Sequence, residues 1–243
     1  EVLTELPDKI EQNMILPFND EEEKIYVANL AKANKKLQEL YDLEGSDKMQ
    51  ILNLLTRLRQ LCLEPRLVYD NIDQPSSKLK ACMELIKTMQ ENKQKVLLFS
   101  SFTSVLDLIA EECQKAGITY YMLTGSTNKE DRRELVSRFQ KDDTTLFLIS
   151  LKAGGTGLNL TSAEVVIHFD PWWNVSAQNQ ATDRAYRIGQ KNNVQVFNLV
   201  MKDSVEEKII ELQKRKKELA DMFVENNSGG LSQMSKEDIL SLF

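Results

Sequence analysis

Residues 146–160 read Leu-Phe-Leu-Ile-Ser-Leu-Lys-Ala-Gly-Gly-Thr-Gly-Leu-Asn-Leu, an apolar run that passes directly into a glycine-rich loop. The run Leu146–Ser150 has the length and composition of a strand that is buried on both faces. Glycines in the loop let backbone amides approach an anion closely, so the loop can cradle phosphates. The stretch therefore predicts a buried sheet with a ligand site at the carboxyl end of one strand.

Further apolar runs alternate with helical patterns along the middle of the chain. They are Val96–Ser100, Tyr120–Thr124, Val165–Phe169 and Val194–Val200. Helices are expected over residues 77–92, 103–116 and 174–186, and from Asn128 onward. Because these runs are almost wholly apolar rather than alternating, they favour a parallel sheet covered on both sides. The predicted fold class is α/β, a doubly wound parallel sheet over residues 77–202.

The two ends of the chain read as helical additions to this domain. Residues 1–18 form an extended lead-in, and Asn19 caps the first of two helices that end before Pro65. Residues 66–76 resemble a linker. A long helix starts at Ser204, with Glu207 completing a capping box, and runs to about residue 226 before a short tail helix. The expected segments are 1–76, 77–202 and 203–243.

Composition limits the functions that the chain can have. The net charge is −6, so nucleic acid must be bound by a local patch rather than by the whole surface. Cys62, Cys82 and Cys113 lack metal-ligand spacing and suit buried free thiols in a reducing compartment. The cysteine spacing therefore predicts no metal site. No apolar run approaches the ~18 residues of a membrane span, so no membrane partner is expected.

A second polar signature lies about 25 residues after the first. It reads Gln180-Ala-Thr-Asp-Arg-Ala-Tyr-Arg-Ile-Gly-Gln190 and places Arg184 and Arg187 three residues apart. Such a pair usually marks a solvated helix surface, but here it ends a helix that follows a strand, and Gly189 then frees the backbone. Arginine suits phosphoryl transfer because its charge is permanent and its donors fork across two oxygens.

The sequence contains no Gly-x-x-x-x-Gly-Lys-Ser/Thr loop. We therefore expect the two arginines to reach a nucleotide that another domain holds. The chain begins at Glu1 rather than Met, so an excised piece is expected, with the phosphate-binding loop upstream. Asp20–Glu23 reads as a helix start, not as a magnesium-binding motif, and the isolated chain is expected not to hydrolyse ATP.

Taken together, these motifs resemble the second RecA-like lobe of superfamily-two helicases, and above all the Swi/Snf group of ATP-dependent DNA translocases. The resemblance rests on segments that cover nearly the whole chain. They are residues 54–66, Val96–Phe102, Leu123–Ser126 with Arg132-Arg133, Ser150–Leu160, Asp170-Pro-Trp-Trp-Asn174 and Gln180–Gln190. Asp170–Asn174 is typical of this group rather than of RNA helicases.

The resemblance implies roles for individual residues. Arg184 and Arg187 would be arginine fingers that complete an ATP and Mg²⁺ site built mainly by an amino-terminal RecA-like lobe of the same parent protein. Nucleotide contacts would come from Gln180, Gly157, Asn159, Gly189 and Gln190. Contacts to double-stranded DNA would come from Ser100, Ser101, Gly125, Ser126, Ser150 and Lys152. These side chains follow strand ends and would grip phosphates without reading bases.

Two positions depart from the pattern of the group. Tyr186 stands where many eukaryotic members have histidine, which favours a bacterial or archaeal member, and Leu151 stands where a hydroxyl residue is common. Trp172 and Trp173 suit either packing beneath the helix at 174–186 or a contact at the interface between lobes. His168 is expected in the core without a catalytic role.

The first hypothesis is thus the carboxyl-terminal motor lobe of a DNA-stimulated ATPase that moves along duplex DNA and displaces or shifts DNA-bound proteins. It would be cytoplasmic in a prokaryote and nuclear in a eukaryote. The alternative is a docking module for DNA or protein that retains the fold without catalysis. The intact Gln180, Arg184, Arg187 and Gln190 argue against that alternative. An RNA helicase lobe is disfavoured by Asp170–Asn174 and by the helical insertion.

Overall fold

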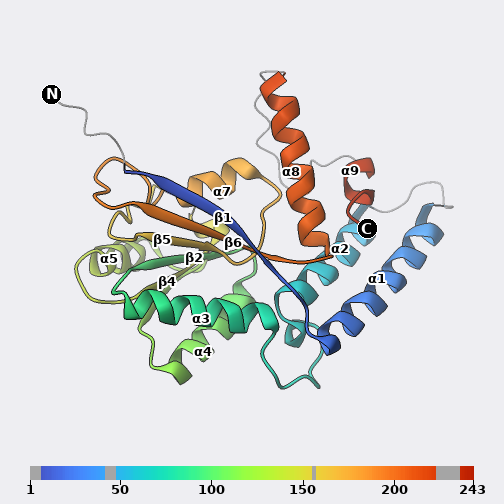
Figure 1. Cartoon of the computed structure of the whole chain (residues 1–243), viewed down its shortest axis with the longest axis horizontal. Coiled ribbons are helices and arrows are strands. Elements are labelled where there is room, and N and C mark those ends of the chain that lie inside the picture. Colours follow the sequence, from blue (N-terminus) through green and yellow to red (C-terminus); the bar gives the residue numbers. More distant parts are fainter. Residues whose placement is uncertain (1–6, 42–47, 155–156, 223–235) are drawn as a thin grey trace. The chain divides into compact units, whose positions relative to one another are not determined.

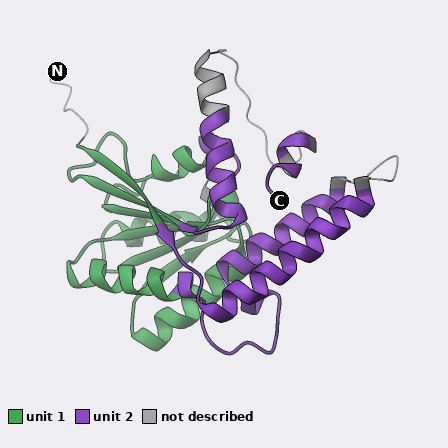
Figure 2. Cartoon of the chain, turned by 45° about the vertical axis from the view of Figure 1, so that its right-hand side comes forward, with its two compact units in different colours: residues 1–14, 80–172, 176–199 green, residues 15–79, 173–175, 200–243 purple. Residues whose placement is uncertain are grey.

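The computed structural model describes residues 7–41, 48–154, 157–222 and 236–243. The chain divides into two compact units, coloured separately in Figure 2. Unit 1 comprises Glu1–Met14, Lys80–Trp172 and Ser176–Leu199, and unit 2 comprises Ile15–Leu79, Trp173–Val175 and Val200–Phe243. Each unit is built from segments that lie far apart in the sequence, so neither corresponds to one continuous stretch of chain.

A six-stranded parallel sheet forms the framework of the fold, and this confirms the predicted α/β class (Figure 1). The strand order is β1-β6-β5-β2-β4-β3. The bounds are Lys9–Leu16 for β1, Val96–Ser100 for β2, Tyr120–Leu123 for β3, Leu146–Ser150 for β4, Val165–His168 for β5 and Val194–Met201 for β6. The register aligns Ser100 with Ser150, so both predicted phosphate-binding serines end neighbouring strands at one edge of the sheet.

Helices cover both faces of the sheet in unit 1. The helix α4 (Thr103–Ala116) packs against β2, β3 and β4. The opposite face carries α5 (Lys129–Phe139) and α7 (Val175–Thr182), and α6 (Leu151–Gly154) follows β4 as a single turn. On that face Phe139 of α5 and Ala181 of α7 are fully or almost fully buried in one cluster with the strand residues Phe99 and Phe147. The strands are therefore apolar because helices bury both faces of the sheet, as their composition predicted.

Unit 2 is a helical assembly. Its elements are α1 (Asp20–Tyr41), α2 (Lys48–Leu63), the 3-10 turn η1 (Pro65–Leu67), the start of α3 (Ser77–Glu91), α8 (Val205–Met222) and α9 (Lys236–Leu240). Leu55, Leu58, Val205 and Ile209 belong to its buried core. The predicted cap is confirmed, because Asn19 Oδ1 accepts from the amides of Glu21 and Glu22 at 3.0 and 2.9 Å.

Two local expectations need correction. The lead-in is an edge strand, β1, whose Asp8 and Leu16 carbonyls accept from the amides of Val194 and Lys202. The capping box at α8 is displaced, since Glu207 accepts from the Asp203 amide rather than the Ser204 amide. The predicted end of that helix at residue 226, the Gly229-Gly230 stop and Gly45-Ser46 fall outside the described residues.

The helix predicted over 174–186 ends at Thr182, where the regular pattern of hydrogen bonds four residues apart changes. The amide of Leu160 donates to the Arg184 carbonyl at 3.0 Å, which removes that carbonyl from the helical ladder. The amides of Arg184 and Ala185 bond the carbonyls of Ala181 and Thr182, three residues back. The two arginines therefore lie in a series of turns after α7 rather than on one helix face.

Candidate nucleotide and DNA site

The turns after α7 bring the predicted arginines together. A concavity of about 520 Å³ is lined by Gln180, Asp183, Arg184, Tyr186, Arg187 and Ile188. Arg187 is exposed, and Ile188 is 87% exposed at the same rim. The structure thus places both guanidinium groups and Gln180 around one opening on unit 1, although the helix that was expected to align them is shorter.

Neither arginine is held by an internal ion pair with any residue that the structure describes. Arg184 is half-buried, and its Nε atom is buried without a hydrogen-bond partner. A buried donor without a partner costs about 1–3 kcal/mol, more for a charged group, so a ligand that accepts from it is favoured. The donor set therefore fits an anion such as a phosphate group.

Gln190 has a structural role at the end of this segment. Its Nε2 donates to the carbonyls of Ala163 and Ala185 at 2.8 and 3.1 Å, and its Oε1 accepts from the amides of Lys191 and Asn192 at 2.9 and 3.0 Å. The side chain is 8% exposed. All its amide atoms are engaged, so in this conformation it closes the loop rather than facing a ligand. Gly189, at φ +105°, supplies the turn.

The predicted nucleotide contacts do not share one opening. Gly157, at φ +46°, and Asn159 line a separate concavity of about 640 Å³. Its other lining residues are Thr127, Lys129, Arg132, Arg133, Val136, Ser137 and Leu158. The basic residues of α5, not the two arginines after α7, are thus the neighbours of the glycine loop. Gly155 and Thr156 fall outside the described residues.

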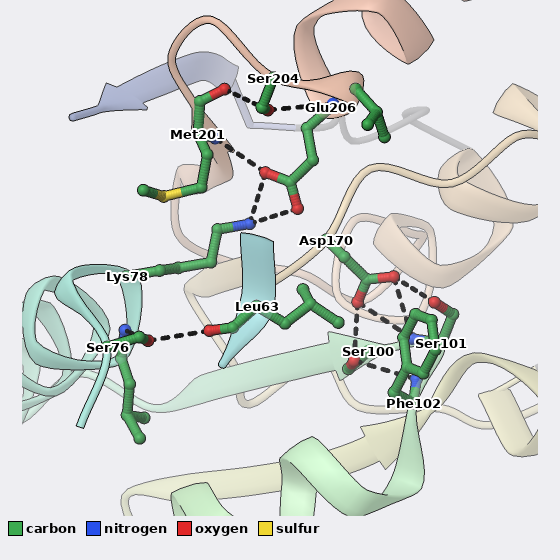
Figure 3. A network of polar contacts seen from close by, with 12 residues as sticks. Leu63, Ser76, Lys78, Ser100, Ser101, Phe102, Asp170, Met201, Ser204 and Glu206 are labelled. Carbon is green, nitrogen blue, oxygen red and sulfur yellow. Dashed lines mark hydrogen bonds and ion pairs between the residues drawn. The ribbon is translucent and has the colours of Figure 1, made fainter. Parts of the chain in front are cut away.

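Ser100 and Ser101 are held by Asp170 (Figure 3). The Ser100 hydroxyl donates to Asp170 Oδ1 at 2.6 Å, and the hydroxyl and amide of Ser101 also donate to this carboxylate. Ser100 is fully buried and Asp170 is 1% exposed. Because both hydroxyl protons are committed to Asp170, neither serine can donate to a phosphate in this conformation. Sequence reasoning missed this role of Asp170.

The other predicted DNA contacts divide by exposure. Gly125, Ser126 and Lys152 are exposed, and the Ser126 hydroxyl lies 2.8 Å from that of Thr124. Ser150 is 3% exposed, and its oxygen accepts from the Ala153 amide at 3.4 Å, which caps α6. Gly125, Ser126 and Lys152 are therefore free to meet a phosphate backbone, while Ser150 positions the turn that carries Lys152.

His168, Trp172 and the cysteines are structural. His168 is 1% exposed, and burial lowers its pKa to about 4, against a smaller opposing effect of Asp170. Trp172 packs against the core of unit 1, and Trp173 joins the core of unit 2 with Arg59 stacked on its ring. All three cysteines are buried free thiols, as predicted.

Within the described ranges, no group of three His, Cys, Asp or Glu side chains suits a metal ion, and no helix has the length and apolarity to cross a bilayer.

Comparisons with known proteins show the family of the chain. The family model described as "Helicase conserved C-terminal domain" matches residues 77–189. The core of the SWI2/SNF2 ATPase of Sulfolobus solfataricus, solved in complex with dsDNA, is 31% identical, with a TM-score of 0.77 over 98% of this chain and 51% of that chain. The chain belongs to the Swi/Snf family of helicase carboxyl-terminal lobes.

Curated relatives of this Swi/Snf lobe are much longer proteins. An uncharacterized ATP-dependent helicase of Mycoplasma pneumoniae is 36% identical over 243 residues, which cover 100% of this chain and 23% of the relative. The ISWI chromatin-remodeling complex ATPase ISW1 of Saccharomyces cerevisiae is 34% identical over 262 residues, with the same 100% and 23% coverage. The chain thus spans about a quarter of the length of these relatives.

Proposed function

We propose that the chain is the carboxyl-terminal motor lobe of an ATPase that moves along double-stranded DNA. The observation that carries the proposal is the opening lined by Gln180, Arg184 and Arg187, in which the Arg184 Nε lacks a protein partner. Two cationic side chains that are not neutralised by carboxylates suit the γ-phosphate of a nucleotide held elsewhere.

In this proposal ATP and Mg²⁺ are bound mainly by an amino-terminal RecA-like lobe of the parent protein. Bound there, Mg²⁺ would supply positive charge that offsets the charge of the phosphates. When the two lobes close, Arg184 and Arg187 orient the transferred phosphoryl group and stabilise its negative charge. Gln180, one turn before Arg184, contacts the same nucleotide. Gln190 holds residues 183–190, the arginine segment, in place.

Duplex DNA contacts are proposed along the strand ends that carry Gly125, Ser126 and Lys152. Their exposure leaves backbone amide, hydroxyl and ammonium donors available to phosphates. The concavity lined by Lys129, Arg132 and Arg133 adds positive charge beside Gly157. Contacts of this kind hold the DNA backbone without reading bases. Repeated closure and reopening of the two lobes would therefore move the protein along DNA and shift another protein bound there. The Sulfolobus core solved with dsDNA supports this assignment.

The test joins this chain to its natural amino-terminal lobe and measures ATP hydrolysis with and without duplex DNA. Turnover should be stimulated by duplex DNA, while the chain alone should show none. DNA binding by the chain alone should be weak and should fall steeply with salt. Tight binding that resists salt, together with an inactive two-lobe protein, would instead favour a docking module without catalysis.

A further inference from the structure

A continuous set of buried amide side chains connects the arginine segment to the edge of the sheet in unit 1. Gln178, in α7, donates from Nε2 to Asn198 Oδ1 at 3.1 Å, and its Oε1 accepts from the Trp172 amide at 3.1 Å. Asn198, in β6, donates from Nδ2 to Glu11 Oε1 and Asn13 Oδ1 of β1 at 3.0 and 2.9 Å. The connection therefore runs from α7 across β6 to the outermost strand.

Both amides at the centre of this set are almost fully buried, at 7% exposure for Gln178 and 4% for Asn198. A buried amide is stable only when its donors and acceptors are satisfied, so the partners fix the orientation of each side chain. An apolar residue at position 198 would pack the same space without these bonds. Asn198 thus holds α7 in one position on the sheet through its bond with Gln178.

A second contact joins β1 to the arginine segment at another point. The Lys9 ammonium lies 5.6 Å from the ring centroid of Tyr186, which stands between Arg184 and Arg187 in the chain. Lys9, Glu11 and Asn13 alternate along β1 and therefore project from the same face of the strand. One face of this strand thus contacts the arginine segment directly through Lys9 and indirectly through Asn198.

Thr182 and His168 hold the end of α7 from the other side. The Thr182 hydroxyl donates to the Gln178 carbonyl at 3.3 Å, so His168 Nε2, 2.9 Å away, donates to Thr182 Oγ1. The last turn of α7 is therefore bonded both to β5 and, through Gln178, to β6. Arg184 and Arg187 follow two and five residues after Thr182, and within the described residues neither has an ion pair of its own to fix it.

We propose that Gln178 and Asn198, anchored on the polar face of β1 formed by Lys9, Glu11 and Asn13, are positioning residues for the proposed arginine fingers. This inference rests on the proposed function. An error of about 1 Å in the position of a catalytic group can cost ~10²-fold in rate, while ground-state binding changes little. The network should therefore act on kcat, and the KM for ATP, whose site is mainly on the other lobe, should stay nearly constant.

The experiment uses the two-lobe protein with saturating duplex DNA and measures kcat, the KM for ATP and the melting temperature. Asn198→Leu should lower kcat about tenfold and change the KM less than about twofold. The exposed pair Glu11→Ala with Asn13→Ala, and separately Lys9→Met, should lower kcat by about two- to fivefold without loss of folding. Glu11→Gln, which keeps the acceptor, and Lys9→Arg, which keeps the cation, should restore most of kcat.

Asn29→Leu is the matched control. Asn29 is 7% exposed, against 4% for Asn198, and makes side-chain hydrogen bonds with Tyr69 and Arg57, but it lies in α1 of unit 2. It should lower the melting temperature as Asn198→Leu does and leave kcat unchanged. Equal kcat losses in both variants, or wild-type kcat in Asn198→Leu, would overturn the positioning role. Arg187→Ala in the same series separates the two ideas: if it also keeps full kcat, the proposed function itself fails.

Discussion

Lys78 and Glu206 form a buried ion pair in unit 2, with Lys78 Nζ at 2.7 and 2.8 Å from the two carboxylate oxygens (Figure 3). The side chains are 0% and 1% exposed. Glu206 Oε2 also accepts from the Met201 amide at 2.8 Å. The pair connects the first turn of α3 with the first turn of α8, although 128 residues separate them in the chain.

Removing one partner of this pair should be costly, because it leaves a buried charge without compensation. Lys78→Met should lower the free energy of unfolding by about 3–5 kcal/mol. The double variant with Glu206→Gln should recover much of that loss, since the remaining amide still accepts from Met201 without a buried charge. Denaturant titrations of the four proteins of this cycle measure both effects, and additive losses would contradict the pairing.

Asp170 holds the turn that carries Ser100 and Ser101, which the family resemblance implies as DNA contacts, so we expect it to act on DNA binding rather than on the nucleotide. Asp170→Ala removes the acceptor for the hydroxyls of Ser100 and Ser101 and frees the turn before α4. In the two-lobe protein the variant should raise the DNA concentration needed for half-maximal ATPase stimulation by about tenfold, because a mobile segment must be ordered again on binding. Asp170→Asn, which retains one acceptor, should lie between. Titration of ATPase activity with duplex DNA measures this, and an unchanged midpoint would exclude the role.

His168 gives a pH dependence with a definite sign. Its pKa in the folded protein is about 4 because of burial, below the ordinary value of about 6.5, so the unfolded chain binds the proton more tightly. Stability from this group is complete above pH 6.5 and is lost as the pH falls toward 4, to a total of about 3 kcal/mol. His168→Gln keeps a donor for Thr182 and does not titrate, so its unfolding free energy should fall less over this window. Parallel pH slopes for the two proteins would contradict the prediction.

The thiols should be inert in the native protein. Cys62, Cys82 and Cys113 are fully or almost fully buried, and burial raises the pKa of Cys113 to about 12 and that of Cys62 well above the usual thiol range. At neutral pH a thiol-specific chromogenic reagent should label none of them until denaturant is added. Rapid labelling of one thiol in the folded protein would show that its environment opens.

Much of the fold followed from the sequence because its signals are local. Apolar runs such as Val96–Ser100 and Leu146–Ser150 favour strands covered on both faces. Asn128 caps α5 as such a residue should, with its Oδ1 accepting from the amides of Glu130 and Asp131. The arginine segment was also recognisable, since its residue types and spacing carry the chemistry.

The parts that could not be predicted depend on contacts between distant segments. The turns after α7 are bonded to a distant segment, because the Leu160 amide donates to the Arg184 carbonyl, and no local propensity encodes that contact. The strand β1 lacks an apolar pattern because it lies at the sheet edge and is mostly exposed. Asn198, a buried polar residue in the mostly apolar strand β6, was the available signal for the network around Gln178.

Arg187 is proposed to act on a nucleotide held by another lobe, and the turnover of Arg187→Ala in the two-lobe protein is the decisive measurement. With saturating duplex DNA, kcat should fall about 10³-fold or more, while the dissociation constant for ATP stays within about threefold of the wild-type value. Arg184→Ala serves as the companion variant. Wild-type turnover in Arg187→Ala, or a loss of ATP binding equal to the loss of turnover, would contradict the account.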